Sequence, residues 1–258
     1  MVPENRSPYI IVFLVKNSCM KKTLILLLLS VLSFYAQGQL GYGPELGVGM
    51  STFKFAAPTS PILYTSSSVS SILSGKLGFL IDVPLSRHLY FQSGLYVSRK
   101  GAERSFSYHF NDSFSEQVHQ SVYANYFDVP IGVVFKKGLQ GKGRIMAGLG
   151  GQPSYIIGGR TMLDDRLVFA GVDSNTKTYG KIETEKTLRG FDIALLVTLG
   201  YEAATGMFVR AWYSSGVNDL GISSEIIKNR TWGLSAGYIF GKGRNSNKDV
   251  DDLIDNTK

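Results

Sequence analysis

Large apolar side chains alternate with small or polar ones along the segment LRGFDIALLVTLGYE, residues 188–202. A period of two puts successive side chains on opposite faces of a β-strand, so we predict a strand with one apolar face. The segment RTWGLSAGYIF, residues 230–240, repeats the pattern. A chain built from such strands must place the apolar face of each strand against a protein core or against lipid.

Eight segments of this kind follow one another, and no convincing helix remains between them. They are residues 41–55, 73–85, 89–106, 119–136, 144–161, 188–202, 207–219 and 228–241. Their connections alternate between long polar ones, at 56–72, 107–118, 162–187 and 220–227, and tight ones, at 86–88, 137–143 and 203–206. An even strand number with short turns at one end and long loops at the other is typical of an outer-membrane barrel. We therefore predict an all-β fold, an eight-stranded antiparallel up-and-down transmembrane β-barrel over residues 39–241.

A secretory signal is predicted upstream of the strands, in MKKTLILLLLSVLSFYAQGQ from Met20. Lys21 and Lys22 form its basic start, an apolar run follows, and the small residues of Ala36-Gln37-Gly38 suit cleavage after Gly38. The alternative is a membrane anchor, but the apolar core of about ten residues is shorter than the roughly 20 that a spanning helix needs. Residues 20–38 are thus expected to be a signal peptide. We interpret residues 1–19 as a probable start-site miscall.

The predicted mature chain lacks thiol chemistry and a strong net charge. Cys19 is the only cysteine, and it precedes the signal peptide. Removing residues 1–38 from a total of 27 basic and 20 acidic residues leaves 23 and 19, a net charge of +4. This charge is too modest to indicate a nucleic-acid partner. We expect the outer membrane of a Gram-negative bacterium as its location, with both termini in the periplasm and residues 242–258 as a flexible periplasmic tail.

The alternative fold is a soluble lipocalin-like barrel, whose apolar parity points inward around a ligand. Parity alone does not say which face lies inside. The secretory signal, a glycine-rich polar parity with charges, and aromatic residues near the strand ends favour the membrane arrangement. These aromatic residues are Tyr90, Phe91, Tyr123, Tyr155, Tyr201, Phe208, Tyr213, Trp232, Tyr238 and Phe240.

Four segments resemble the PorT-like outer-membrane β-barrel family. They are GFLIDVPLSRHLYFQSGLYVSRKGA at 78–102, NYFDVPIGVVFKKG at 125–138, GRIMAGLGGQPSYIIGG at 143–159 and GLSAGYIFGKG at 233–243. The resemblance implies a non-enzymatic structural or accessory barrel in a secretion or surface-assembly complex. The expected partners are outer-membrane lipid and lipopolysaccharide, the barrel-assembly machinery and secretion-complex proteins. A small-solute channel and a soluble lipocalin-like ligand carrier remain alternatives.

The last strand resembles the C-terminal sorting signal that the barrel-assembly machinery reads, with Tyr238 and Phe240 as its alternating aromatic residues. Eighteen residues follow Phe240, whereas that signal is terminal in most barrels. Ser235 also stands where the signal usually has glycine.

Charged residues on the inward parity are the candidate functional residues. They are Glu45, Lys76, Asp82, Lys100, Asp128, Arg144, Asp192, Glu202 and Arg210. Strand directions place Lys76, Lys100 and Asp192 toward the outer end, Asp128 near the middle and the others toward the periplasmic end. An eight-stranded barrel is only wide enough to be filled by side chains, so we expect a charge-paired plug rather than a gated ion path.

No catalytic, metal or cofactor site is expected. His88, His109 and His119 have no evident serine and acid partner at a readable spacing. A metal site of His109, Glu116 and His119 is less favoured than a solvated loop. Pro84, Pro130 and Pro153 lack a ladder donor and are expected to mark bulges or strand ends.

Overall fold

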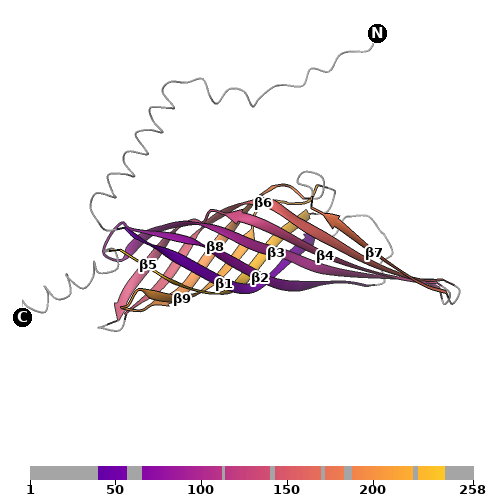
Figure 1. The fold of residues 1–258 in the computed structure, drawn as a ribbon, viewed down its shortest axis with the longest axis horizontal. Coiled ribbons are helices and arrows are strands. Elements are labelled where there is room, and N and C mark those ends of the chain that lie inside the picture. Colours follow the sequence, from indigo (N-terminus) through magenta and orange to yellow (C-terminus); the bar gives the residue numbers. More distant parts are fainter. Residues whose placement is uncertain are drawn as a thin grey trace, which may run out of the picture.

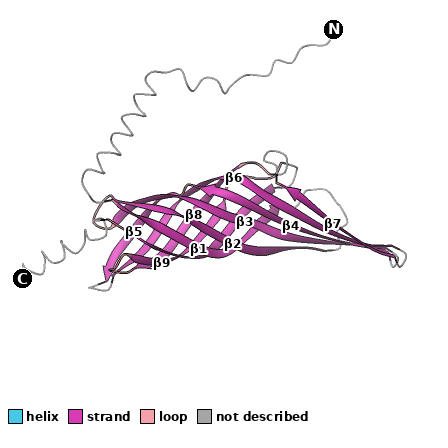
Figure 2. Cartoon of the chain, in the orientation of Figure 1, coloured by secondary structure: helices cyan, strands magenta, loops and turns pink. Residues whose placement is uncertain are grey.

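The computed structural model describes residues 40–56, 66–111, 114–139, 143–169, 172–182, 188–222 and 226–241. Within them lie ten strands and no helix (Figures 1 and 2). The strands are β1 (Gly41–Ala56), β2 (Ser66–Pro84), β3 (Leu89–Asn111), β4 (Phe114–Asp128), β5 (Ile131–Leu139), β6 (Gly143–Phe169), β7 (Val172–Lys181), β8 (Phe191–Glu202), β9 (Met207–Gly216) and β10 (Ile226–Tyr238). The predicted start-site miscall, signal peptide and C-terminal tail lie outside the described residues.

Antiparallel pairing closes eight strand positions into a ring. The pairs β1–β2, β2–β3, β6–β8, β8–β9, β9–β10 and β10–β1 are direct. Both β4 and β5 pair with β3 on one side and with β6 on the other. They therefore occupy one position in the barrel, and the predicted eight-stranded antiparallel barrel is confirmed.

The break between β4 and β5 comes from proline chemistry, not from a change in register. Asp128 lies opposite Ser154 and Ile131 lies opposite Gly151, so the pairing with β6 runs on unchanged across the break. Pro130 has no N–H to donate between them. The bulge or strand end predicted at Pro130 is thus an interruption within one strand.

Two of the predicted long loops are wrong, because they are mostly strand. β3 continues to Asn111 and β4 begins at Phe114, while β6 continues to Phe169 and pairs with the additional strand β7. The first part of β2 also pairs with β3, up to Ser66. Parts of β2, β3, β4, β6 and β7 form an extension of the barrel wall, seen as the taper on the right of Figure 1. These segments escape sequence detection because no lipid face imposes an apolar parity on them.

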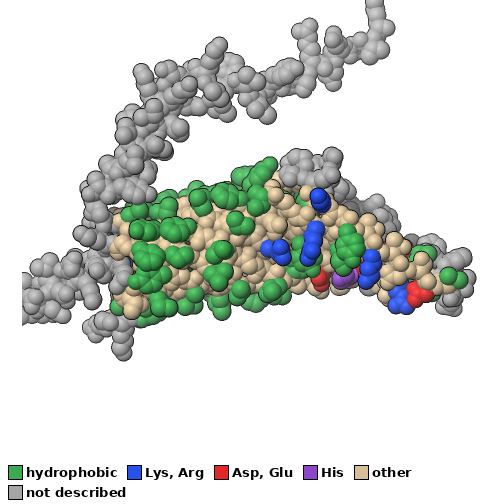
Figure 3. All heavy atoms as spheres, viewed as in Figure 1, with side chains coloured by type: hydrophobic (Ala, Val, Ile, Leu, Met, Phe, Trp, Pro, Cys, Tyr) green, Lys and Arg blue, Asp and Glu red, His purple; other side chains and the backbone are tan. Residues whose placement is uncertain are grey.

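The apolar parity of the barrel faces outward. Leu46, Leu73 and Leu199 have exposed fractions of 60%, 74% and 61%, whereas Glu45 and Glu202 on the opposite parity are each only 1% exposed. Figure 3 shows hydrophobic side chains along the barrel part and Lys and Arg toward the extension. An apolar exterior around a polar interior contradicts the soluble carrier with an apolar ligand cavity.

The outward apolar band has the height of a membrane core. Outward side chains alternate on β8 from Phe191 to Tyr201. Ten steps of about 3.3 Å along a strand tilted by about 40° cover about 25 Å of the barrel axis, the height typical of such bands. At the tight-turn end, Tyr42 lies against Phe79 and Phe240, with ring centroids 6.0 and 5.9 Å apart. The expected aromatic belt is wrong for Tyr90 and Phe208, which are buried inside the barrel.

No helix in the described ranges has the length and hydropathy needed to cross a membrane.

Candidate functional site

The lumen near the tight-turn end is organised by Lys136. Its side chain is fully buried and forms ion pairs with Asp82 and with Glu202, the latter at 2.8 Å. Arg144 also pairs with Glu202 and donates a hydrogen bond to the Tyr90 hydroxyl at 2.8 Å. Two cations thus share Glu202, and the hydroxyl satisfies a further Arg144 donor.

A second group of charges surrounds Glu45. The guanidinium of Arg210 donates to Glu45 Oε1 through Nε at 3.0 Å, and the Lys76 ammonium lies 2.8 Å from the same oxygen. The Tyr96 hydroxyl donates to Glu45 Oε2 at 2.7 Å. This corrects the axial placement of Lys76, whose long side chain reaches down the lumen to the level of Glu45.

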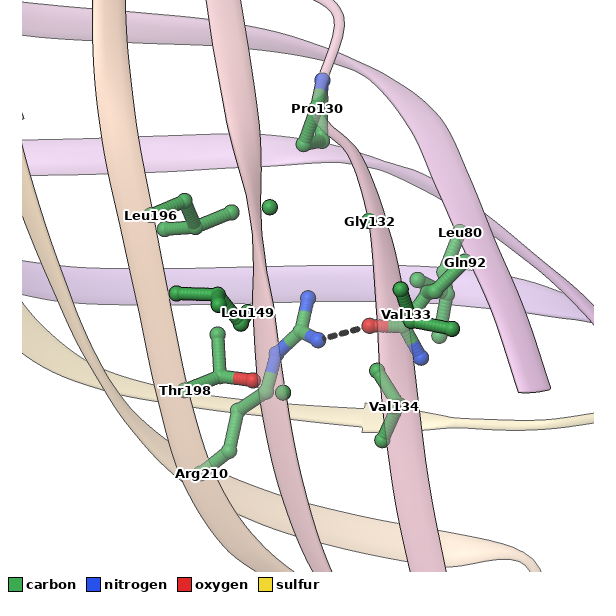
Figure 4. Close-up of a pocket in the computed structure, with 12 residues that line it drawn as sticks. Leu80, Gln92, Pro130, Gly132, Val133, Val134, Leu149, Leu196, Thr198 and Arg210 are labelled. Carbon is green, nitrogen blue, oxygen red and sulfur yellow. Dashed lines mark hydrogen bonds between the residues drawn. The ribbon is translucent and has the colours of Figure 1, made fainter. Parts of the chain in front are cut away.

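Gln92 joins these two groups. It accepts a hydrogen bond from Arg210 and donates to Asp82 at 3.3 Å. Figure 4 shows the Arg210–Gln92 contact beside a cavity of about 20 Å³, which is room for about one water molecule. This cavity therefore does not amount to a solute path.

A third group lies toward the extension. Lys100 pairs with Asp128 at 2.9 Å and donates to the Ser154 hydroxyl at 3.3 Å, while Ser98 donates to Asp128 at 2.7 Å. Asp192 lies in the same part of the barrel and accepts a hydrogen bond from Asn229 at 3.3 Å. Asp128, expected near the middle, is thus paired with the cation predicted at the outer end.

The structure places all nine predicted lumen residues inside the barrel and adds Lys136. That residue lies eight positions after Asp128 and has the same parity, but its position next to a predicted turn hid it. With it, the barrel part holds five acids and five bases. The acids are Glu45, Asp82, Asp128, Asp192 and Glu202, and the bases are Lys76, Lys100, Lys136, Arg144 and Arg210.

Two buried apolar clusters pack among and beside these charges in the lumen. One buried cluster lies near the tight turns and consists of Leu80, Tyr90, Val134, Met146, Phe208 and Ile239. The other lies toward the extension and consists of Ala124, Tyr126, Ile156, Ile182, Leu188 and Leu220. Ile182, Leu188 and Leu220 come from connections rather than from strands, so chain outside the barrel wall helps to cover that end.

One histidine has polar neighbours that its sequence spacing did not reveal. Cross-strand pairing places Ser105 opposite His119, and Ser105 Oγ lies 2.7 Å from His119 Nδ1. His119 Nε2 lies 3.9 Å from the Glu103 carboxylate. These partners come together only through cross-strand pairing, so the sequence spacing examined for His119 could not reveal them. The three side chains lie on one face of the paired strands β3 and β4.

The candidate metal site of His109, Glu116 and His119 falls only partly on described side chains and stays untested. No group of three or more His, Cys, Asp or Glu side chains in the described part of the chain is placed to hold a metal ion. The side chain of His109 lies outside the described part.

The sorting-signal residues lie at the seam of the barrel. Phe240 exchanges two backbone hydrogen bonds with Tyr42, of 3.0 and 2.6 Å, and its ring lies 4.6 Å from that of Tyr238. Phe240 is 46% exposed on the outside.

The model of a family described as outer membrane protein beta-barrel domain matches residues 35–221. The chain belongs to this family. Membership together with the apolar exterior places the barrel in the outer membrane of a Gram-negative bacterium. No curated protein matches the sequence.

Similar solved structures are distant. The attachment invasion locus protein Ail of Yersinia pestis is 15% identical, covers 78% of this chain and 98% of its own, and has a TM-score of 0.32. Neisserial surface protein A is 10% identical, with coverages of 76% and 97% and a TM-score of 0.33. The outer membrane protease OmpT of Escherichia coli is 9% identical, with coverages of 78% and 96% and a TM-score of 0.32. We transfer no function from structures at this level of similarity.

Replacing Lys136 by methionine is expected to destabilise the folded barrel by about 3–5 kcal/mol, because Asp82 loses its buried cation and Glu202 loses one of two. Unfolding in urea, followed by the heat-sensitive gel mobility of the folded barrel, measures the effect. Lys137→Met is the matched control, since Lys137 is exposed on the opposite parity. Adding Asp82→Asn to Lys136→Met should recover part of the loss; a double variant as unstable as the sum of both single variants would contradict the pairing.

Proposed function

We propose that the protein is a non-enzymatic outer-membrane barrel with a structural or accessory role in a secretion or surface-assembly complex, as the PorT-like resemblance implies. The observation that supports it most is the filled lumen, where five acids and five bases pack together with two apolar clusters. A barrel filled in this way suits a scaffold better than a channel.

The extension is the part of this barrel best suited to meet other proteins. β7 is exposed along its whole length and pairs only with β6 among the described strands. We assign the extension to the cell exterior and the tight turns to the periplasm, because outer-membrane barrels have short periplasmic turns. The proposed partners are secretion-complex proteins, the barrel-assembly machinery through Tyr238 and Phe240, and outer-membrane lipid and lipopolysaccharide around the apolar band.

Purified protein in a planar bilayer should give no stepwise conductance of open-pore size, because paired charges and apolar side chains fill the lumen. A variant with Arg210→Ala and Tyr96→Ala is the positive control, since it removes two large side chains that contact Glu45 in the lumen. Reproducible open-pore steps from the unaltered protein would favour the small-solute channel instead.

A fluorophosphonate, which labels activated serines, should not label the purified protein. Ser105 and His119 are adjacent, but an activated serine also needs a pocket and an oxyanion hole. Mass spectrometry of the treated protein checks this. Labelling that disappears in the Ser105→Ala variant would overturn the non-enzymatic proposal.

Orientation and contact can be tested together, because a chain begun at Met20 contains no cysteine. Tyr179→Cys on β7 should react in intact cells with a membrane-impermeant thiol cross-linker and form adducts with other surface proteins. Ala204→Cys, in a tight turn, should react only after permeabilisation.

Reaction of Ala204→Cys but not Tyr179→Cys in intact cells would reverse the proposed orientation. Reaction at Tyr179→Cys without protein adducts would count against the extension as the contact surface. The two parts of the proposal therefore fail separately.

A further inference from the structure

Three cations gather on the outward face where β1 meets β10. Lys54 lies directly opposite Lys228, and Arg230 lies opposite Thr52, one outward position closer to the apolar band. Lys54 and Arg230 are exposed and Lys228 is half-buried. We call Lys54, Lys228 and Arg230 the seam cations.

Among the described residues, the seam cations have no carboxylate in contact to balance them. None of the ion pairs formed within the described residues includes any of the three. Lys228 has a weak electrostatic influence on Asp219. The Asp219 carboxylate accepts hydrogen bonds from the backbone N–H groups of Ile227 and Gly221 at 2.8 and 2.9 Å. These bonds hold the pKa of Asp219 below its usual range and occupy one of its oxygens. Like charges directly opposite each other destabilise a strand pair, so an anion from outside the chain would stabilise this one.

Three other cations toward this end of the barrel have partners on the chain. Arg99 donates to Asn125 at 3.3 Å, and the guanidinium of Arg160 lies 5.3 Å from the centre of the Tyr123 ring. Arg166 forms a salt bridge of 2.5 Å with Asp173. The seam cations differ from these in having three positive charges and no such contact.

Aromatic residues fix the height of the seam cations relative to the membrane. Trp232 follows Arg230 on the outward parity of β10 and lies opposite Tyr213 of β9, with exposed fractions of 57% and 43%. Leu234 and Val48, one position further along, are exposed apolar residues facing each other across the same seam. Trp and Tyr concentrate at the level of lipid head groups, so the seam cations lie at or just beyond that level.

We propose that the seam cations bind a phosphate of a phosphorylated glycolipid in the outer leaflet, with Trp232 and Tyr213 against the sugar or the upper acyl chain. Arginine offers paired donors that match a phosphate, and two ammonium groups supply further charge. The hydroxyls of Thr52 and Ser215, which lie opposite Arg230 on its two neighbouring strands, are available beside it. This site deepens the proposed lipid contact and rests on the proposed orientation of the barrel.

Trp232 reports on the site directly. The chain has two tryptophans, and Trp212 is buried in the lumen, so a Trp212→Phe background leaves Trp232 as the single tryptophan, which can be excited selectively. Bisphosphorylated lipid A, titrated into this protein in zwitterionic detergent, should change Trp232 emission with a saturable midpoint. Lipid A stripped of its phosphates should bind about tenfold or more weakly, because the charge-assisted contacts are lost.

The test variant combines Lys54→Gln, Lys228→Gln and Arg230→Gln, and it should also weaken binding by about tenfold or more. The charge-matched control combines Arg166→Gln, Lys177→Gln and Lys181→Gln on β6 and β7, and it should bind as the unaltered background does. Heat-sensitive gel mobility verifies folding of both. Lys54→Arg with Lys228→Arg keeps the charge and should retain binding.

Equal binding by the test and control variants would overturn the site, as would equal binding of phosphorylated and stripped lipid A. Full competition by inorganic phosphate alone would also overturn the glycolipid assignment, since it would show a free-anion site. Lipid A binding in detergent does not depend on whether β7 forms protein adducts, so the site and the accessory role can fail separately.

Discussion

Charge pairing in a narrow lumen is the interaction on which the rest of this barrel depends. Eight strands enclose a space that side chains must fill, and here much of that filling is ionic. Buried charges are tolerated only when each is compensated, and the side chains of Lys136, Arg210 and Glu202 do this by bridging several strands. The same contacts hold the polar side chains of each strand inside the barrel, so the alternate apolar side chains face the membrane.

The barrel could be predicted from the sequence because one physical rule acts along every wall segment. A lipid-facing side chain at every second position leaves a clear period of two, and this gave the eight strand positions and the inward charges such as Glu45 and Asp192. The rule does not operate beyond the membrane. The extensions of β3, β4 and β6 therefore resembled loops, and β7 had no detectable signal.

It was harder to predict which lumen side chains contact each other than to predict which side chains face inward. Parity shows that Lys76 and Glu45 face inward, but only the register of β1 against β2 and the length of the lysine side chain bring their charges together. Ser105 and His119 illustrate the same limit, since they are 14 residues apart and meet only through the pairing of β3 with β4. Cross-strand register is a property of the whole sheet, and a single strand sequence does not contain it.

The interrupted strand formed by β4 and β5 has a consequence for how the wall can deform. Val129 N–H donates to the Pro153 carbonyl at 2.9 Å, but Pro153 has no N–H to return the bond, and Pro130 beside it has none either. Successive residues of a strand bond to opposite neighbours, so the missing Pro153 donor weakens the pairing with β6 and the missing Pro130 donor weakens the pairing with β3. The wall should therefore bend more easily at this position than where both ladders are complete, while the lumen charges on either side hold the strands in place.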